Sequence, residues 1–155
     1  MGLSALLGLL LLVQAPVSAP EQFFIGRTEG TGTAHVMLSG RHGVRDRSRG
    51  RMERGVLVID QVVEEEGKPP RTRQWRLSRS GANGITGTLS DARGPVTGEV
   101  AGNVLNLRYR LVEGGVSVEQ QITLQPGGRT AQNRMTFRRF GLNVATVEET
   151  IRRVD

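Results

Sequence analysis

Apolar and polar residues alternate along most of this chain from Phe23 onward, and this two-residue period constrains the fold more than any other feature. Residues 105–111 show the period most clearly. Their apolar and polar positions fall on opposite parities, with Leu105, Leu107, Tyr109 and Leu111 against Asn106, Arg108 and Arg110. Because successive side chains of a strand point to opposite faces, this segment is predicted to be a half-buried strand. Residues 116–124 repeat the pattern after a short Glu113-Gly114-Gly115 turn, which predicts a hairpin.

The same rule predicts further strands, which gives about nine in total. They cover residues 33–38, 54–63, 72–79, 85–90, 96–101, 130–138 and 143–151. Glycine, proline and asparagine recur between these segments as turn formers, and no long amphipathic helix pattern interrupts them. Successive hairpins without crossover helices predict an all-β antiparallel meander. Closing it into an up-and-down barrel of about eight to nine strands removes the exposed edges, and an open sandwich is the alternative.

The first 19 residues differ from the rest because they carry no charge. Their apolar stretch, residues 3–13, is too short for a spanning helix, which needs about 20 residues. Val17-Ser18-Ala19 supplies the small residues that signal peptidases accept. We therefore expect a helical signal peptide at 1–19, a barrel domain at 20–155, and an exported protein of the periplasm or cell envelope. An uncleaved anchor and a buried helix are the alternatives.

Residue types that carry catalysis or bind metals are scarce. The sequence has no cysteine, which excludes disulfides, thiolate metal sites and cysteine nucleophiles. Its two histidines, His35 and His42, have no cluster of metal-ligating residues around them. No Gly-x-Ser-x-Gly motif surrounds a serine. The sequence therefore predicts a protein that is not an enzyme and uses no metal or cofactor, with His35 the least unsuitable catalytic candidate.

Positive charge is concentrated in one segment. The chain has a net charge of +6, and arginines crowd residues 41–54, where Arg45, Arg47 and Arg49 would share a face if the segment were extended. Nucleic acid is an unlikely partner because no aromatic residue is interleaved with these arginines. We expect an arginine-rich loop near the barrel mouth that binds anions such as membrane headgroups. A solvated loop is the alternative.

Several short segments of the chain carry a family resemblance through their order and spacing. They are residues 23–26 with Gly30 and Gly32, residues 73–77, 85–91, Gly94, Gly98, and residues 101–106, 109–111 and 135–142. Together they resemble an uncharacterised bacterial family of exported putative lipoproteins, a domain of unknown function. The resemblance implies a lipocalin-like β-barrel and an exported protein, but no activity. Members often carry a lipidated cysteine at the cleavage site, which this chain lacks, so a lipid anchor is not implied here.

The barrel interior is where we expect any ligand. The inward-facing residues predicted to line a cavity are Trp75, Leu107, Tyr109, Ile122 and Phe137. The predicted function is a non-catalytic binding or carrier module of the cell envelope for a small apolar or lipid-like ligand. The alternative is a solid-core structural or interaction module that docks through the arginine-rich loop on an anionic surface or a protein partner. A cavity of about 300 Å³ or more would favour the carrier.

Overall fold

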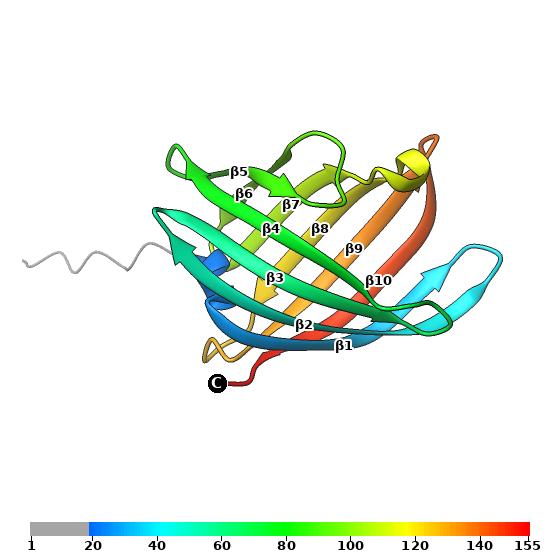
Figure 1. The fold of residues 1–155 in the computed structure, drawn as a ribbon, viewed down its shortest axis with the longest axis horizontal. Helices are drawn as coiled ribbons and strands as arrows, with labels where there is room; N and C mark the ends of the chain where they lie inside the picture. The colour runs from blue at the N-terminus through cyan, green and yellow to red at the C-terminus, as the bar shows by residue number, and fades with distance from the viewer. Residues whose placement is uncertain (1–18) are drawn as a thin grey trace, which may run out of the picture.

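The computed structural model describes residues 19–155, which form a closed antiparallel barrel in which each strand pairs with the next and β10 pairs with β1 (Figure 1). The strands are β1 (Gly26–Val36), β2 (Gly40–Glu53), β3 (Val56–Glu65), β4 (Arg71–Ser80), β5 (Gly84–Leu89), β6 (Val96–Ala101), β7 (Val104–Arg110), β8 (Ser117–Leu124), β9 (Thr130–Arg139) and β10 (Leu142–Arg153). Two 3₁₀ turns, η1 (Pro20–Phe24) and η2 (Glu113–Gly115), complete the described chain. The prediction of an all-β antiparallel up-and-down barrel is confirmed. The predicted signal helix lies outside the described residues except for its last residue, Ala19.

The predicted count of eight to nine strands is wrong, because the barrel has ten. The missed strand is β2, which we expected to be an arginine-rich loop. Its inward positions are Val44, Asp46, Ser48 and Gly50, so only one of them carries a large apolar side chain and the alternation rule does not detect the strand. Gly50 is required where it stands, because a Cβ there would collide with the backbone carbonyl of Phe24. The strand is nevertheless paired along its length with both β1 and β3.

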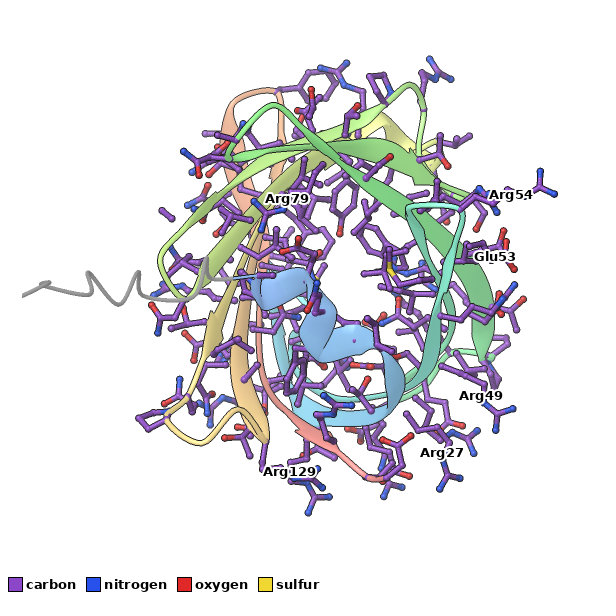
Figure 2. All side chains as sticks on the ribbon, turned by 90° about the vertical axis from the view of Figure 1, so that its left-hand side faces the viewer. Arg27, Arg49, Glu53, Arg54, Arg79 and Arg129 are labelled. Atoms are coloured by element: carbon purple, nitrogen blue, oxygen red, sulfur yellow. The ribbon has the colours of Figure 1, made fainter. Side chains whose placement is uncertain are left out.

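The two ends of the barrel differ. The end that contains the β2–β3, β4–β5, β6–β7 and β8–β9 turns is closed by η1, which crosses it as a plug (Figure 2). Phe23 and Phe24 of η1 are buried with their rings edge to face, 5.2 Å apart. Glu21 fastens the plug to β4, because its carboxylate accepts a hydrogen bond of 2.6 Å from Nε of Arg79. We call the opposite end, which no such element covers in residues 19–155, the mouth.

The half of the barrel nearer η1 is a solid core. Leu57, Leu77, Leu105 and Ile151 are almost completely buried there. The space left between them and η1 amounts to about 30 Å³, close to the volume of one water molecule. Close packing of this kind is the ordinary state of a protein interior. The room for a ligand therefore lies in the other half.

Candidate functional site

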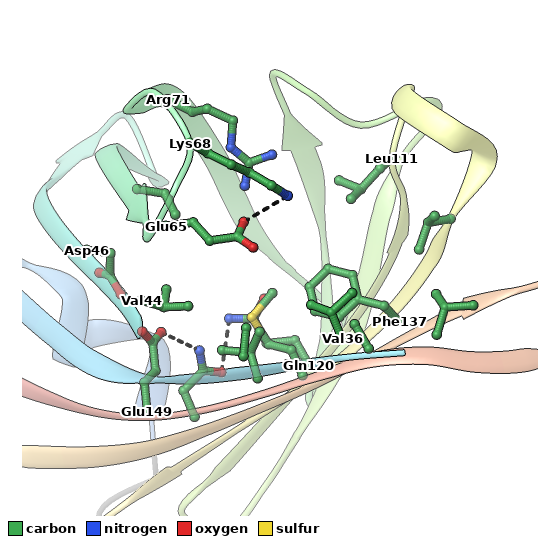
Figure 3. Close-up of a pocket in the computed structure, with 18 of the residues that line it drawn as sticks. Val36, Val44, Asp46, Glu65, Lys68, Arg71, Leu111, Gln120, Phe137 and Glu149 are labelled. Carbon is green, nitrogen blue, oxygen red and sulfur yellow. Dashed lines mark hydrogen bonds and ion pairs between the residues drawn. The ribbon is translucent and has the colours of Figure 1, made fainter. Parts of the chain in front are cut away.

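A cavity of about 340 Å³ occupies the mouth half of the barrel (Figure 3). Its wall is built mainly from β1, β2, β3, β9 and β10, whose inward apolar residues near the mouth are mostly valine and alanine. The apolar part of the wall includes Ala34, Val36, Val44, Val63, Met135, Phe137 and Val147. Valine and alanine fill less of the barrel than the leucines and aromatic rings of the other half. The free volume follows from this difference in side-chain size.

The floor of the cavity is a chain of polar side chains from four consecutive strands. The Tyr109 hydroxyl of β7 donates a hydrogen bond of 3.0 Å to Oε1 of Gln120 on β8. Nε2 of Gln120 donates to Oδ1 of Asn133 on β9 at 3.1 Å, and Nδ2 of Asn133 donates to Oε1 of Glu149 on β10 at 2.7 Å. All four residues are buried. Every donor points the same way round the barrel, so the chain delivers its last hydrogen bond to a carboxyl group.

That carboxyl group has a second acid beside it. Glu149 is 7% exposed and Asp46 on β2 is 5% exposed, and the two side chains meet in the space next to Gly30. A Cβ at Gly30 would contact both carboxyl groups, so the glycine on β1 makes room for the pair. Burial, and then the neighbouring Asp46 carboxylate, raises the pKa of Glu149 to about 8. Near neutral pH Glu149 therefore holds a proton, and that proton removes the repulsion within the pair.

The second oxygen of Glu149 faces the other acid of the pair. Oε2 of Glu149 accepts no hydrogen bond from any donor among residues 19–155, and it is inaccessible to solvent. A buried polar atom without a partner is costly. The proton that Glu149 holds avoids this cost, because the protonated carboxyl donates it to Asp46.

The opposite side of the floor carries a buried cation. Arg73 of β4, with its side chain 7% exposed, donates from Nε to Oε1 of Gln61 at 2.9 Å and lies 3.5 Å from the Asp91 carboxylate. Its guanidinium also stacks on the Trp75 ring, 5.2 Å from the ring centre. Trp75 packs edge to face on Tyr109 at 5.2 Å. These contacts hold the aromatic pair between the cavity and the solid core.

The residues predicted to line a ligand cavity all point into the barrel, but at different depths. Phe137 lines the large cavity. Trp75, Leu107 and Ile122 border the small space nearer η1, and Tyr109 supports the cavity floor through Gln120. A ligand-binding role for these five residues stays a prediction.

Apart from Tyr109, sequence reasoning missed the polar floor. The sequence feature that could have revealed it is a polar residue at a strand position that points into the barrel. Gln120, which shares this face of β8 with Val118 and Ile122, is an example. Asp46 was hidden because, within a run of arginines, it is easily taken for a compensating surface charge.

The predicted anion-binding residues lie on a strand. Arg45, Arg47 and Arg49 all project from the outer face of β2, as expected for an extended segment, and Arg47 contacts Glu64 at 3.4 Å. The prediction that they belong to a loop is wrong, because β2 is paired on both sides. Among the arginines labelled near the closed end, Arg27, Arg49 and Arg129 point away from the barrel (Figure 2). We call the outward row Arg45, Arg47 and Arg49 the arginine stripe.

The histidines lie on the neighbouring strands β1 and β2. Nε2 of His42 is 3.1 Å from the Ser39 hydroxyl. Within residues 19–155 no three histidine or acidic side chains gather as a metal site would require. The same part of the chain contains no helix with the length and apolar character needed to cross a membrane.

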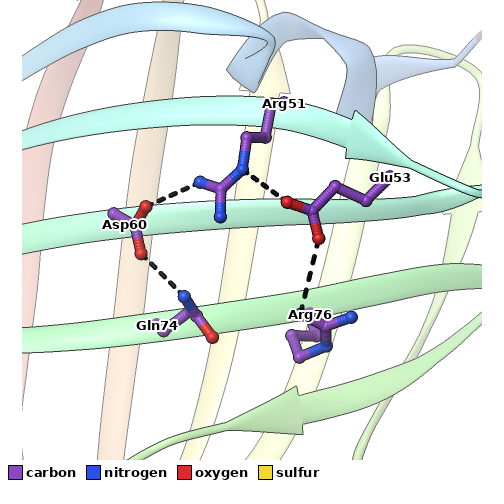
Figure 4. A network of polar contacts seen from close by, with 5 residues as sticks. All are labelled: Arg51, Glu53, Asp60, Gln74 and Arg76. Atoms are coloured by element: carbon purple, nitrogen blue, oxygen red, sulfur yellow. Dashed lines mark hydrogen bonds and ion pairs between the residues drawn. The ribbon is translucent and has the colours of Figure 1, made fainter.

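Polar contacts on the outer wall tie β2, β3 and β4 together. Arg51 donates to Glu53 and to Asp60 at 2.7 Å each, and Gln74 donates to the other oxygen of Asp60 at 2.8 Å (Figure 4). These hydrogen bonds lower the pKa of Asp60, with Gln74 the larger cause. The network is exposed on the outer face of the barrel. It links three neighbouring strands there and does not reach the cavity.

Comparison with solved structures finds the same barrel fold in other proteins. The S-type phycobiliprotein lyase CPES from Guillardia theta aligns with a TM-score of 0.68 and 10% identity, over 89% of this chain and 93% of that one. Rv2717c from M. tuberculosis aligns with a TM-score of 0.69 and 13% identity, over 91% and 99%. The protein EF1p2_mFAP2b bound to DFHBI aligns with a TM-score of 0.50 and 11% identity, over 89% and 99%. At such identities the likeness establishes the fold alone.

The sequence matches no curated protein significantly. A family model does match it, over residues 13–153, and that family is described as a protein of unknown function. The resemblance to a domain of unknown function with a barrel fold is confirmed to this extent, whereas the bacterial, exported and lipoprotein character of the family stays a prediction. On the strength of a match that spans most of the sequence, the chain belongs to the DUF3833 family.

Proposed function

We propose that this protein is a non-catalytic binding module that holds a small apolar or lipid-like molecule in the mouth cavity. The observation that carries the proposal is the cavity itself, which has a volume of about 340 Å³, an apolar wall and a buried polar floor. Ligand sites typically begin at about 300 Å³ and combine an apolar lining with a few fixed polar groups. The solid-core alternative does not account for this volume.

The cavity suits a ligand with two chemically different ends. Its apolar body would lie against Val44, Val63 and Val147. Its polar end would lie at the polar floor, where Asp46, Gln120 and Glu149 line the cavity. A similar barrel that is bound to DFHBI supports the idea that this fold accommodates a small molecule. The expected envelope location rests on residues 1–19 and remains part of the proposal.

Filling the cavity tests the proposal directly. Val63 faces the cavity, whereas its neighbour Val62 on β3 lies on the outer surface, so the two residues offer a matched pair. Val63→Trp should weaken binding of the neutral dye N-phenyl-1-naphthylamine by at least about tenfold, because the ring takes the space of the ligand. Val62→Trp should leave it unchanged. Dye fluorescence measures both, and thermal unfolding checks that both variants fold.

Native mass spectrometry of the protein from its own host completes the test. A retained small molecule that is lost in Val63→Trp and kept in Val62→Trp would identify the cavity as its site. Equal dye affinities in both variants, together with no retained molecule in the wild-type protein, would refute the proposal.

A further inference from the structure

Large apolar side chains that are exposed to solvent gather at the mouth. In residues 19–155 the mouth turns and the residues next to them expose Met37, Leu38, Val112, Phe140 and Leu142, whereas Met52 and Val154 are exposed near the closed end. Leu38 is 100% exposed and Phe140 is 90% exposed. Single exposed apolar residues are common on protein surfaces, but a group of them at one end of a barrel marks an interaction site.

The backbone at the two most exposed of these residues is strained. Leu38 has a φ of 72° and Phe140 has a φ of 52°, which place both in the left-handed region. This region suits glycine and asparagine, while a leucine or phenylalanine there is an outlier. Neither side chain gains burial in return. The fold itself therefore gives no reason for a large apolar residue at either tip.

The two tips lie on adjoining hairpins at the mouth. They belong to the β1–β2 and β9–β10 turns, and β1 pairs with β10, with the Met37 amide donating to the Val144 carbonyl at 2.9 Å. Met37, Leu38, Phe140 and Leu142 therefore stand on one side of the mouth, and we call them the apolar rim. Met37 and Val144 also line the cavity, so apolar surface continues from the rim into the barrel.

The charged residues of the two hairpins that carry the apolar rim are arginines near its tips, and the acid beside them is Glu66 of the β3–β4 turn, whose carboxylate accepts a hydrogen bond of 3.0 Å from the Gly43 amide. Residues 36–43 and 137–144 contain Arg41, Arg138 and Arg139 but no aspartate or glutamate. The Arg139 guanidinium lies over the Phe140 ring, 5.2 Å from its centre. Arg138 is paired with Glu119 at 2.9 Å, which leaves Arg41 and Arg139 as the cations closest to the tips. Exposed apolar side chains with adjacent arginines match the interface of an anionic bilayer, where acyl chains lie beneath phosphate groups.

We propose that the apolar rim docks the mouth of the barrel on the surface of an anionic lipid bilayer. Leu38 and Phe140 enter the headgroup region, and Arg41 and Arg139 lie at the level of the phosphates. In this orientation the cavity opens toward the lipid, so an apolar ligand passes between bilayer and barrel without crossing water. Docking itself needs no ligand, so it stands or falls separately from the function proposed for the cavity.

The first test removes the apolar tips without disturbing the turns. Asparagine tolerates the left-handed region, so the double variant Leu38→Asn, Phe140→Asn should fold with an unchanged or higher melting temperature. Its partition onto vesicles of three parts phosphatidylcholine to one part phosphatidylglycerol should fall at least about tenfold. The matched control is Met52→Asn, which replaces an exposed apolar residue near the closed end and should bind like wild type. Unchanged partition of the double variant would overturn the proposal.

The second test locates the contact. Because the chain lacks cysteine, a single Leu142→Cys or Met52→Cys substitution carries a fluorescent label at the rim or near the closed end. With vesicles that contain a lipid-borne quencher, the label at 142 should be quenched and the label at 52 should not. Quenching at 52 alone would assign the contact to residues 1–18, the closed end or the arginine stripe, and would overturn the proposal. Concentration-dependent dimers that the double variant abolishes, without vesicle binding by the wild type, would overturn it in favour of self-association.

Discussion

Replacing Glu149 with glutamine should remove most of the pH dependence of stability that this protein has between pH 5 and pH 8. Glu149 ordinarily ionises near 4.5 when unfolded, but burial and the Asp46 carboxylate raise its pKa to about 8 in the barrel. Between these values the folded protein keeps a proton that the unfolded chain has released. Raising the pH therefore favours unfolding, and the stability present below pH 4.5 is lost as the pH approaches 8.

The size of the effect follows from the proton difference. One proton held only by the folded state costs about 1.4 kcal/mol of unfolding free energy for each pH unit. Between pH 5 and pH 8 the wild-type protein should lose on the order of 4 kcal/mol. For a domain of this size that corresponds to a melting temperature lower by roughly 10 °C. The charged groups around Glu149 are Asp46 from β2 and Arg73 from β4, and Arg73 opposes the shift only weakly.

Glutamine keeps the geometry and removes the titration. Its carbonyl oxygen still accepts the hydrogen bond from Asn133, and its amide nitrogen donates to Asp46 without needing a proton from solution. Glu149→Gln should thus match wild type near pH 5 and exceed it at pH 8. The control is Glu148→Gln, one residue away on the outer face, where the side chain is 62% exposed and lies 3.8 Å from Arg134. Urea unfolding at several pH values measures each slope, and equal slopes for wild type and Glu149→Gln would refute the reasoning.

Two further outcomes can be checked with the same protein. Gly50→Ala should destabilise the fold by about 1–3 kcal/mol, because its Cβ collides with the Phe24 carbonyl of the plug, whereas Gly43→Ala on the same strand meets only the flexible end of Glu66 and should be close to neutral in urea unfolding. Burial raises the pKa of Tyr109 to about 12, so the ultraviolet signal of tyrosinate should appear only near that pH; because Tyr109 is the one tyrosine, a signal near pH 10 would show that its hydroxyl is in water.

The alternation of apolar and polar residues was sufficient to predict the barrel, because a closed antiparallel sheet needs only strands of period two and short turns between them. It failed at β2, where the inward positions after Val44 are occupied by an acid, a serine and a glycine. Two of these residues have a cause in the three-dimensional structure: Asp46 belongs to the cavity floor, and Gly50 leaves room for the backbone of the plug. Strands are recognised by apolar residues at every second position. When those positions instead hold the polar residues of a site, or a glycine that lets another backbone come close, the pattern is lost.

The cavity floor was harder to predict, since its members are scattered along the sequence. Asp46, Gln120, Asn133 and Glu149 come together only through the register of β1, β2, β8, β9 and β10. A shift of one residue in any pairing would turn one of them outward. The plug was missed for a different reason, because Phe23 and Phe24 stand outside the strand pattern and fill the closed half from its end. That filling explains why Trp75, Leu107 and Ile122 border almost no free space.

The turns themselves carry information that the strand pattern ignores. Glycine occupies most of the left-handed positions in the described chain, and the exceptions are Leu38, Arg54 and Phe140. Keeping a non-glycine residue in that region costs about 1–2 kcal/mol. Arg54 at the closed end has a polar side chain, which water solvates. Leu38 and Phe140 combine the backbone strain with apolar side chains that are exposed to water. Both occur at the mouth, on adjoining hairpins, above the cavity. The folded barrel does not need an exposed apolar residue in the left-handed region at either turn. The proposed docking of the mouth on a bilayer would explain why both turns carry one.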